Sequence, residues 1–162
     1  MKLLTMGIEK LDKNKFELIK NREFFNKPRG GLWSSPYCEE NEFKSDWYRW
    51  CQEEQFNSDI NIGVIFCLES NSRILKIDSF DDLKFITDKY ENINIDEFPI
   101  KQKFLDFEKI SKDYDVIYLT NKGEQETRYT FEYSLYGWDV ETVLILNYDC
   151  IDSNSQKTIK FN

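Results

Sequence analysis

The chain has 162 residues, of which 40% are hydrophobic and 16% aromatic, so it is long and apolar enough to build one packed domain rather than a disordered segment. Its 30 acidic and 22 basic residues give a formal net charge of −8, which disfavours nucleic acid as a partner unless one local basic groove survives. The chain contains no histidine, which excludes a Ser-His-Asp triad, a Cys-His pair and a His-ligated metal ion.

The cysteines and the hydropathy pattern predict the cellular compartment of the protein. No two of the four cysteines have C-x-x-C spacing, so we expect no metal site and four reduced thiols. No apolar run approaches the roughly 20 residues of a membrane span, and the first residues lack the charged-then-apolar pattern of a signal peptide. We therefore expect a cytoplasmic protein with no membrane partner.

The first half of the chain alternates short apolar runs with polar connections. In chain order, the sequence predicts a strand over Lys2–Ile8, a connection over residues 9–29, a strand over Leu32–Pro36 and a helix from Ser45 to about Gln55. Two apolar runs follow, at Ile62–Leu68 and Arg73–Ile77. Because turn residues separate these two runs, we expect them to form a hairpin.

The second half continues the mixture of helices and strands. In chain order, the sequence predicts a helix after Ser79, a loop over Asn92–Lys103, a short helix at Phe107–Ile110, a strand over Val116–Leu119, a turn at Asn121–Gly123, a strand over Thr142–Leu146 and an edge strand at Thr158–Phe161. Arg128 and Tyr129 are expected in a solvated loop. No repeat or linker divides the chain, so residues 1–162 predict a single α+β domain.

Asp139 and Glu141 stand where the apolar run Thr142–Leu146 begins. If the strand includes them, residues two apart share a face, and both carboxylates point into one cleft. The alternative is that they are solvated residues at a strand end, which is the commoner role of acidic side chains there.

A resemblance to the ADP-ribosyltransferase family rests on three segments. Gly30-Gly31-Leu32-Trp33-Ser34-Ser35 resembles the strand of the nicotinamide site, and Ser34-Ser35 partly matches the Ser-Thr-Ser motif of toxin-like members. Lys44–Tyr48 is similar to the Lys-Ser-x-x-Tyr helix start of the members like poly(ADP-ribose) polymerase. Asp139-Val140-Glu141 resembles the acidic-x-Glu motif that leads into a strand. The resemblance covers residues 1–150.

This resemblance implies an NAD-dependent mono-ADP-ribosyltransferase whose α+β domain has split mixed or antiparallel sheets and a few peripheral helices. The acceptor would be a macromolecule, protein rather than nucleic acid. Glu141 would accept a hydrogen bond from the ribose 2′-hydroxyl and stabilise an oxocarbenium-like charge, while Asp139 would orient or deprotonate the acceptor. The residues expected to contact NAD are Thr5, Gly7, Arg29, Gly31, Trp33, Ser34, Ser35 and Tyr48.

The family's first strand carries a His or an Arg, whereas Lys2 and Thr5 are the only polar side chains in residues 2–7 of this chain. Three alternatives to an NAD-dependent transferase therefore stay open. A non-catalytic acidic protein that presents carboxylates to a basic partner is the first alternative. An NAD glycohydrolase on the same fold is the second. The third is that Gly30-Gly31 is only a turn and that the serines only satisfy backbone groups.

Overall fold

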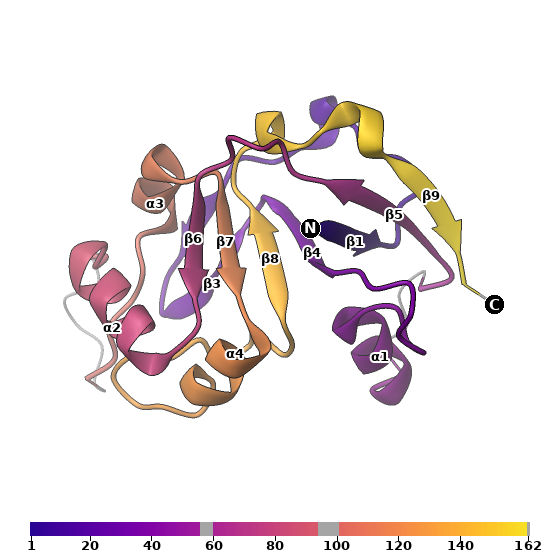
Figure 1. The fold of residues 1–162 in the computed structure, drawn as a ribbon. Coiled ribbons are helices and arrows are strands. Elements are labelled where there is room, and N and C mark those ends of the chain that lie inside the picture. Colours follow the sequence, from indigo (N-terminus) through magenta and orange to yellow (C-terminus); the bar gives the residue numbers. More distant parts are fainter. Residues whose placement is uncertain (56–59, 94–100, 162) are drawn as a thin grey trace.

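A seven-stranded sheet organises the residues described by the computed structural model, which are 1–55, 60–93 and 101–161 (Figure 1). The strands are β1 (Lys2–Met6), β4 (Leu32–Pro36), β5 (Ile62–Cys67), β6 (Ile74–Ile77), β7 (Val116–Leu119), β8 (Thr142–Ile145) and β9 (Lys157–Lys160). Their order across the sheet is β6-β7-β8-β4-β1-β5-β9. β6 and β7 run parallel, and every other neighbouring pair is antiparallel.

The remaining elements surround this sheet. They are the hairpin of β2 (Lys20–Arg22) and β3 (Phe25–Arg29), the helices α1 (Asp46–Glu53), α2 (Phe80–Lys89), α3 (Phe107–Asp113) and α4 (Asn121–Thr127), and three single 3₁₀ turns at Lys13–Lys15, Tyr148–Cys150 and Ser153–Ser155. Strong twist turns β1, β5 and β9 across the direction of β6, β7 and β8 (Figure 1). The α+β class with mixed and antiparallel strands is therefore confirmed.

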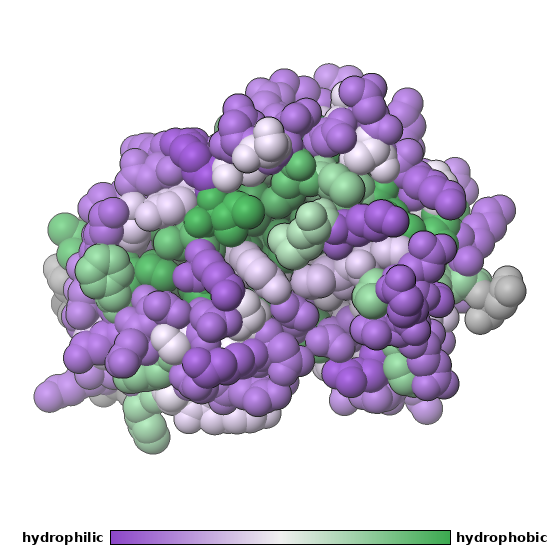
Figure 2. All heavy atoms as spheres, viewed as in Figure 1, coloured by the Kyte–Doolittle hydropathy of each residue, from purple (hydrophilic) through white to green (hydrophobic). Residues whose placement is uncertain are grey.

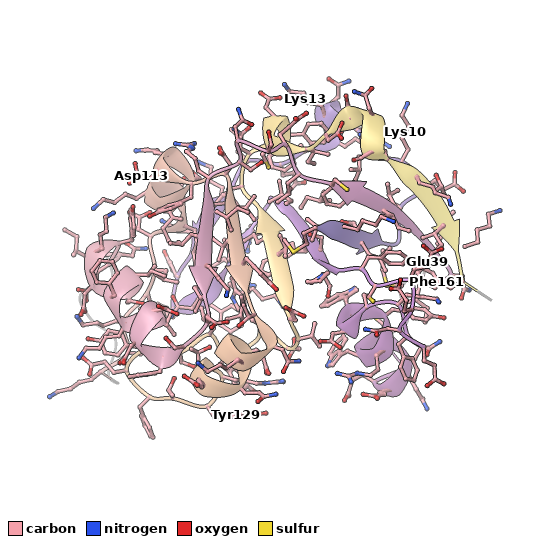
Figure 3. The ribbon with its side chains drawn as sticks, in the orientation of Figure 1. Lys10, Lys13, Glu39, Asp113, Tyr129 and Phe161 are labelled. Atoms are coloured by element: carbon pink, nitrogen blue, oxygen red, sulfur yellow. The ribbon has the colours of Figure 1, made fainter. Side chains whose placement is uncertain are left out.

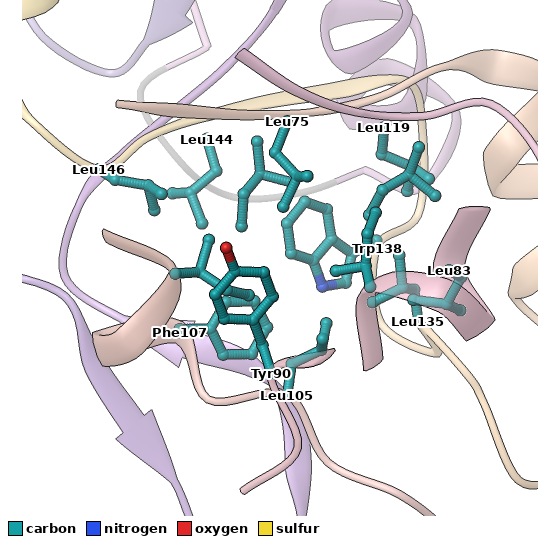
Figure 4. Packing of buried hydrophobic residues seen from close by; sticks show 14 of the residues in the cluster. Leu75, Leu83, Tyr90, Leu105, Phe107, Leu119, Leu135, Trp138, Leu144 and Leu146 are labelled. Atoms are coloured by element: carbon teal, nitrogen blue, oxygen red, sulfur yellow. The ribbon is translucent and has the colours of Figure 1, made fainter. Parts of the chain in front are cut away.

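Side chains alternate between two apolar clusters, one on each face of the sheet. We call the first face the Trp138 face, because Leu144 of β8 packs there with the buried Trp138 (Figure 4). Trp33 of β4 packs against the same cluster. We call the other the Val143 face, where Val143 and Leu3 join a second cluster. Over the view in Figure 2, hydrophilic side chains cover the rim and apolar ones gather toward the middle. Both faces of the central strands are thus anchored.

Capping explains where the helices begin. Ser45 and Ser79 each accept a hydrogen bond from a backbone N–H three residues on, at the starts of α1 and α2. Both helices and the short α3 were predicted, and these predictions are confirmed. None of the helices in the described part of the chain is long and apolar enough to cross a lipid bilayer.

The predicted hairpin between Ile62–Leu68 and Arg73–Ile77 is wrong. β5 pairs with β1, whereas β6 lies at the opposite edge beside β7. The side chains of the two strands pack in different clusters. Phe66 of β5 is buried in the cluster of the Val143 face, and Leu75 of β6 is buried in the cluster of the Trp138 face. The connection through α2 and α3 then returns the chain parallel to β6, which a tight turn cannot do.

Two other predictions fail for local reasons. Asn121-Lys122-Gly123 is not a turn but the start of α4, where the Thr120 hydroxyl accepts a hydrogen bond of 3.0 Å from the Gly123 N–H. The predicted connection over residues 9–29 contains the hairpin β2–β3. Most of the loop predicted over Asn92–Lys103 lies outside the described residues.

Asp115 ties together the ends of three strands. It is 7% exposed and accepts hydrogen bonds from Arg73 through the backbone N (2.9 Å), Nε (3.0 Å) and Nη2 (2.8 Å), and from Asn147 Nδ2 (3.2 Å). The Arg73 guanidinium lowers the pKa of Asp115 from 3.8 to about 2 against the opposing effect of burial.

We expect this carboxylate to make stability pH-dependent in acid. Its folded pKa is depressed, so its contribution of about 2 kcal/mol is present above pH 4 and lost as the pH falls from about 4 to about 2. Urea unfolding across this range should show the loss, and Asp115→Asn should remove it. The exposed pair of Lys13 and Asp149 provides the control, since Asp149→Asn should change stability by less than about 0.5 kcal/mol. Equal effects of the two substitutions would contradict the assignment.

Candidate functional site

Two of the three segments that resemble family motifs lie at neighbouring strands: the Gly-Gly-Leu-Trp-Ser-Ser segment enters β4 and the acidic segment directly precedes β8, whereas Lys44–Tyr48 begins α1. Ser34 of β4 pairs with Val143 of β8, and Leu4 of β1 pairs with Ser35 of β4. Since side chains alternate along a strand, Ser34, Val143 and Thr5 point to the same face. The sheet therefore brings the first strand, the Gly-Gly-Leu-Trp-Ser-Ser segment and the acidic segment side by side.

Glu141 lies on the Val143 face, at the mouth of β8. It precedes the strand in a bend, and its half-buried carboxylate accepts a hydrogen bond of 2.6 Å from the Tyr118 hydroxyl. Tyr118 pairs with Val143, which places its ring on that face. Burial raises the pKa of Tyr118, and the bond to Glu141 raises it further, so the phenol stays protonated and remains a donor.

Sequence reasoning did not find Tyr118. Its position in an apolar strand is typical of a core residue, and only the register between β7 and β8 reveals its partner. The signal available in the sequence was a tyrosine on a predicted strand that also contains Ile117 and Leu119, which gives no hint of a carboxylate 23 residues later.

The Tyr118–Glu141 bond should be measurable as a coupling energy. In a double-mutant cycle of Tyr118→Phe and Glu141→Ala, we expect about 1 kcal/mol of coupling in the free energy of unfolding, because a half-buried, charge-assisted hydrogen bond is lost in each single variant. Urea unfolding of the four proteins provides the measurement. Strictly additive effects would show that the two side chains do not interact.

Asp139 has a different environment from Glu141. Arg128 donates from Nη2 to its carboxylate at 2.8 Å and from Nη1 to its backbone carbonyl at 3.1 Å, and Lys27 Nζ lies 3.9 Å from the carboxylate. Burial lowers the pKa of Lys27, while Asp139 raises it. The Asp139 carboxylate is therefore paired with two positively charged side chains.

The expectation that Asp139 and Glu141 share one strand face is wrong. The strand begins at Thr142, and both acids precede it. Arg128, expected in a solvated loop, instead follows α4 and holds Asp139 and Glu124, the latter at 3.1 Å. Since the residues leave extended geometry before the strand starts, the alternation rule does not apply to them.

Trp138 fixes the segment that carries both acids. It is 1% exposed, its Nε1 donates to the Asn26 carbonyl at 2.6 Å, and its ring contacts Trp33 edge-on with centroids 4.9 Å apart. Gly137 precedes it with φ of +94°, and a Cβ there would lie 2.9 Å from the Phe25 ring. The acidic segment is thus held between β3 and the core.

Two of the expected NAD-contacting side chains lie on the Val143 face with their hydroxyls already engaged. Thr5 Oγ1 donates to the Trp33 carbonyl at 3.1 Å, and Ser34 Oγ donates to the Val143 carbonyl at 2.6 Å. Both residues are buried. Ser35 points to the opposite face, and its buried hydroxyl has no hydrogen-bond partner among the described residues.

Three other residues expected to contact NAD lie elsewhere than on the Val143 face or among its buried hydroxyls. Trp33 packs against Trp138 on the Trp138 face, and Tyr48 is 7% exposed, stacked on Phe161 with centroids 4.1 Å apart. Arg29 is exposed on the hairpin β2–β3. Trp33 and Tyr48 therefore pack against other rings in the protein.

The two expected glycines serve close backbone packing. Gly7 has φ of +78° and donates from its N–H to the Ile62 carbonyl at 2.9 Å. Gly31 has φ of +68°, and a Cβ there would lie 2.7 Å from the Ile145 carbonyl oxygen. Gly31 and Leu32 also line a cavity of about 140 Å³ closed by Phe16 and Tyr148.

Comparison of the chain with protein-family models, with curated proteins and with solved structures found no match. Within the described ranges, no three Cys, Asp or Glu side chains gather closely enough to hold a metal ion. NAD as the ligand and the lack of a metal both stay predictions from the sequence.

Proposed function

We propose that the chain is a cytoplasmic NAD-dependent mono-ADP-ribosyltransferase that modifies a macromolecule, with Glu141 at the reacting ribose. One observation carries the proposal. Two segments more than 100 residues apart resemble motifs of this family, and they lie in β4 and directly before the adjacent strand β8, with Ser34 and Glu141 on one face and Thr5 of the next strand, β1, on the same face. Adjacency of this kind is what a shared site requires.

The chemistry of the reaction assigns the main role to the Glu141 carboxylate. Departure of nicotinamide leaves positive charge on the ribose, and a carboxylate that accepts a hydrogen bond from the 2′-hydroxyl stabilises that charge where it develops. Tyr118 holds Glu141 in one orientation. The hydroxyls of Thr5 and Ser34 already donate to backbone carbonyls, so the hydrogen-bonding capacity left to these two buried groups is that of acceptors.

The state of Asp139 favours NAD glycohydrolase as the second candidate. Its carboxylate is already paired with Arg128 and Lys27, so it is not free to accept a hydrogen bond from an acceptor nucleophile. When no acceptor is activated, water attacks the same ribose carbon and the products are ADP-ribose and nicotinamide. The proposed transferase therefore needs an acceptor that is nucleophilic without help from Asp139.

The test is to incubate the protein with NAD labelled on its adenylate part, alone and with cell extract. Label on a macromolecule supports transfer, and nicotinamide release without label assigns the glycohydrolase. Glu141→Gln serves to exclude a contaminating activity. Neither product, together with an unchanged melting temperature at saturating NAD, would sink the enzymatic proposal and favour the acidic binding protein.

A further inference from the structure

Exposed aromatic side chains gather around one hollow of the surface. The exposed fractions of Tyr129, Phe131 and Tyr136 are 78%, 85% and 59%, and all three lie within eight positions of the chain. Together with Phe25 they line a hollow of about 300 Å³, and Tyr129 projects beyond the end of α4 (Figure 3). Aromatic rings left in water at this density mark a binding surface.

The lining of this hollow is aromatic and polar rather than aliphatic. Its other members are Phe24, Asn26, Gln102, Arg128, Thr130 and Ser134. Arg128 is the charged side chain of the lining, and its guanidinium carbon lies 5.3 Å from the centroid of the Tyr129 ring. Flat rings beside the Gln102 amide and a cation provide stacking surfaces and hydrogen-bonding groups, which are the two needs of an unpaired nucleobase.

The hairpin β2–β3 reverses the charge of the protein locally. Residues 20–29 contain four cations, Lys20, Arg22, Lys27 and Arg29, against one carboxylate, Glu23, for a net +3 in a chain of net −8. Lys20 and Lys27 pair with carboxylates outside the hairpin, so Arg22 and Arg29 are the cations it presents to a ligand. Arg22 and Arg29 are exposed and, with Asn21 and Glu23, line a polar hollow of about 340 Å³. A pair of guanidinium groups at the surface matches phosphate oxygens.

The basic hairpin and the aromatic hollow are continuous. The Arg22 guanidinium carbon lies 4.9 Å from the centroid of Phe25, and Phe25 lines the aromatic hollow. Asn26, the next residue, fixes the hairpin to the rest of the molecule through bonds to the carbonyls of Lys103 (3.0 Å) and Ser134 (2.9 Å). Cations and rings are thus held on one rigid surface.

We propose that this surface binds single-stranded nucleic acid, with phosphates on Arg22 and Arg29 and bases stacked on Tyr129 and Phe131. Charge complementarity selects this partner, because the basic segment stands out from an acidic molecule and the adjoining hollow offers rings instead of aliphatic side chains. The inference revises the sequence-based expectation that nucleic acid is disfavoured. It does not rest on NAD chemistry.

The test is fluorescence anisotropy with labelled dT and rU oligonucleotides of about 12 residues, without NAD, at about 50 mM and about 200 mM salt. We expect binding of at least one strand, and the double variant Tyr129→Ala/Phe131→Ala should raise Kd about tenfold or more. Phe85→Ala, at an exposed ring on α2, is the matched control. Arg22→Gln/Arg29→Gln should reduce the salt slope by about 1.4, since each phosphate contact in a single strand contributes about 0.7.

Each contrary outcome overturns the proposal. These outcomes are no binding of either strand at about 50 mM salt, equal competition by a duplex, and binding that the aromatic double variant leaves within about twofold of the wild type. If the wild type binds no oligonucleotide and the aromatic double variant no longer labels a protein in the NAD assay, the surface is a docking site for a protein acceptor instead. The replaced side chains are exposed, so the variants should melt at the wild-type temperature, which a thermal scan verifies.

Discussion

Trp138→Ala is expected to lower the free energy of unfolding by about 3–5 kcal/mol. The side chain is 1% exposed, contacts both Trp33 and Phe107, and donates its indole N–H to the Asn26 carbonyl. Its removal leaves a cavity and a buried carbonyl without its donor. Because total stabilities are about 5–15 kcal/mol, the variant should be close to unfolding at ordinary temperatures.

Urea unfolding followed by far-ultraviolet circular dichroism measures this loss. Trp47→Ala is the matched control, since Trp47 is half-buried on α1 and stacks on Trp50 at the side of the molecule; it should cost less than about 1.5 kcal/mol. Trp138→Phe should fall between the two, because it keeps most of the volume and loses the hydrogen bond. Similar costs for Trp138→Ala and Trp47→Ala would show that Trp138 does not anchor the core.

Glu141→Gln is expected to lower the rate of nicotinamide release about 10²- to 10³-fold or more if the proposed function holds. The substitution keeps the size of the side chain and can keep the bond from Tyr118, so the loss reports the negative charge. The expected change lies in kcat rather than in KM, because the charge on the ribose exists only in the transition state. Stability should change little, since the carboxylate is half-buried.

Two further variants sharpen this prediction. Asp139→Asn should reduce nicotinamide release less than Glu141→Gln, because its carboxylate is already paired with Arg128 and Lys27. Glu132→Gln, at an exposed acid of the same loop, should leave the rate unchanged. A larger loss in Asp139→Asn than in Glu141→Gln would reverse the roles that the geometry gives to the two acids.

Local sequence signals predicted the elements that local chemistry determines. Ser45 and Ser79 predicted the starts of α1 and α2, and short runs of residues predicted all seven strands of the large sheet. Pairing was harder, because β5 and β6 follow one another in the chain yet lie far apart in the sheet. Which cluster each strand joins depends on distant partners that no short window contains.

In the candidate site, too, local motifs were predicted from the sequence and tertiary contacts were not. Glu141 was predicted from its motif, and it is the acid that the structure leaves available. The hydrogen bond from Tyr118 to Glu141 and the ion pair between Arg128 and Asp139 were not predicted, because both depend on tertiary contacts. Trp33 was expected at the ligand on the strength of its neighbours, whereas its alternation with Ser34 turns it toward Trp138.

The pairing of β4 with β8 also has a kinetic meaning. Ser34 bonds to a carbonyl 109 positions away, and this seam joins the β6-β7-β8 part of the sheet to the β4-β1-β5-β9 part. Closing so long a loop makes folding slow relative to helical proteins of the same length. Until the seam closes, Ser34 is not beside Val143, so a partly folded chain contains the residues of the candidate site but not their arrangement.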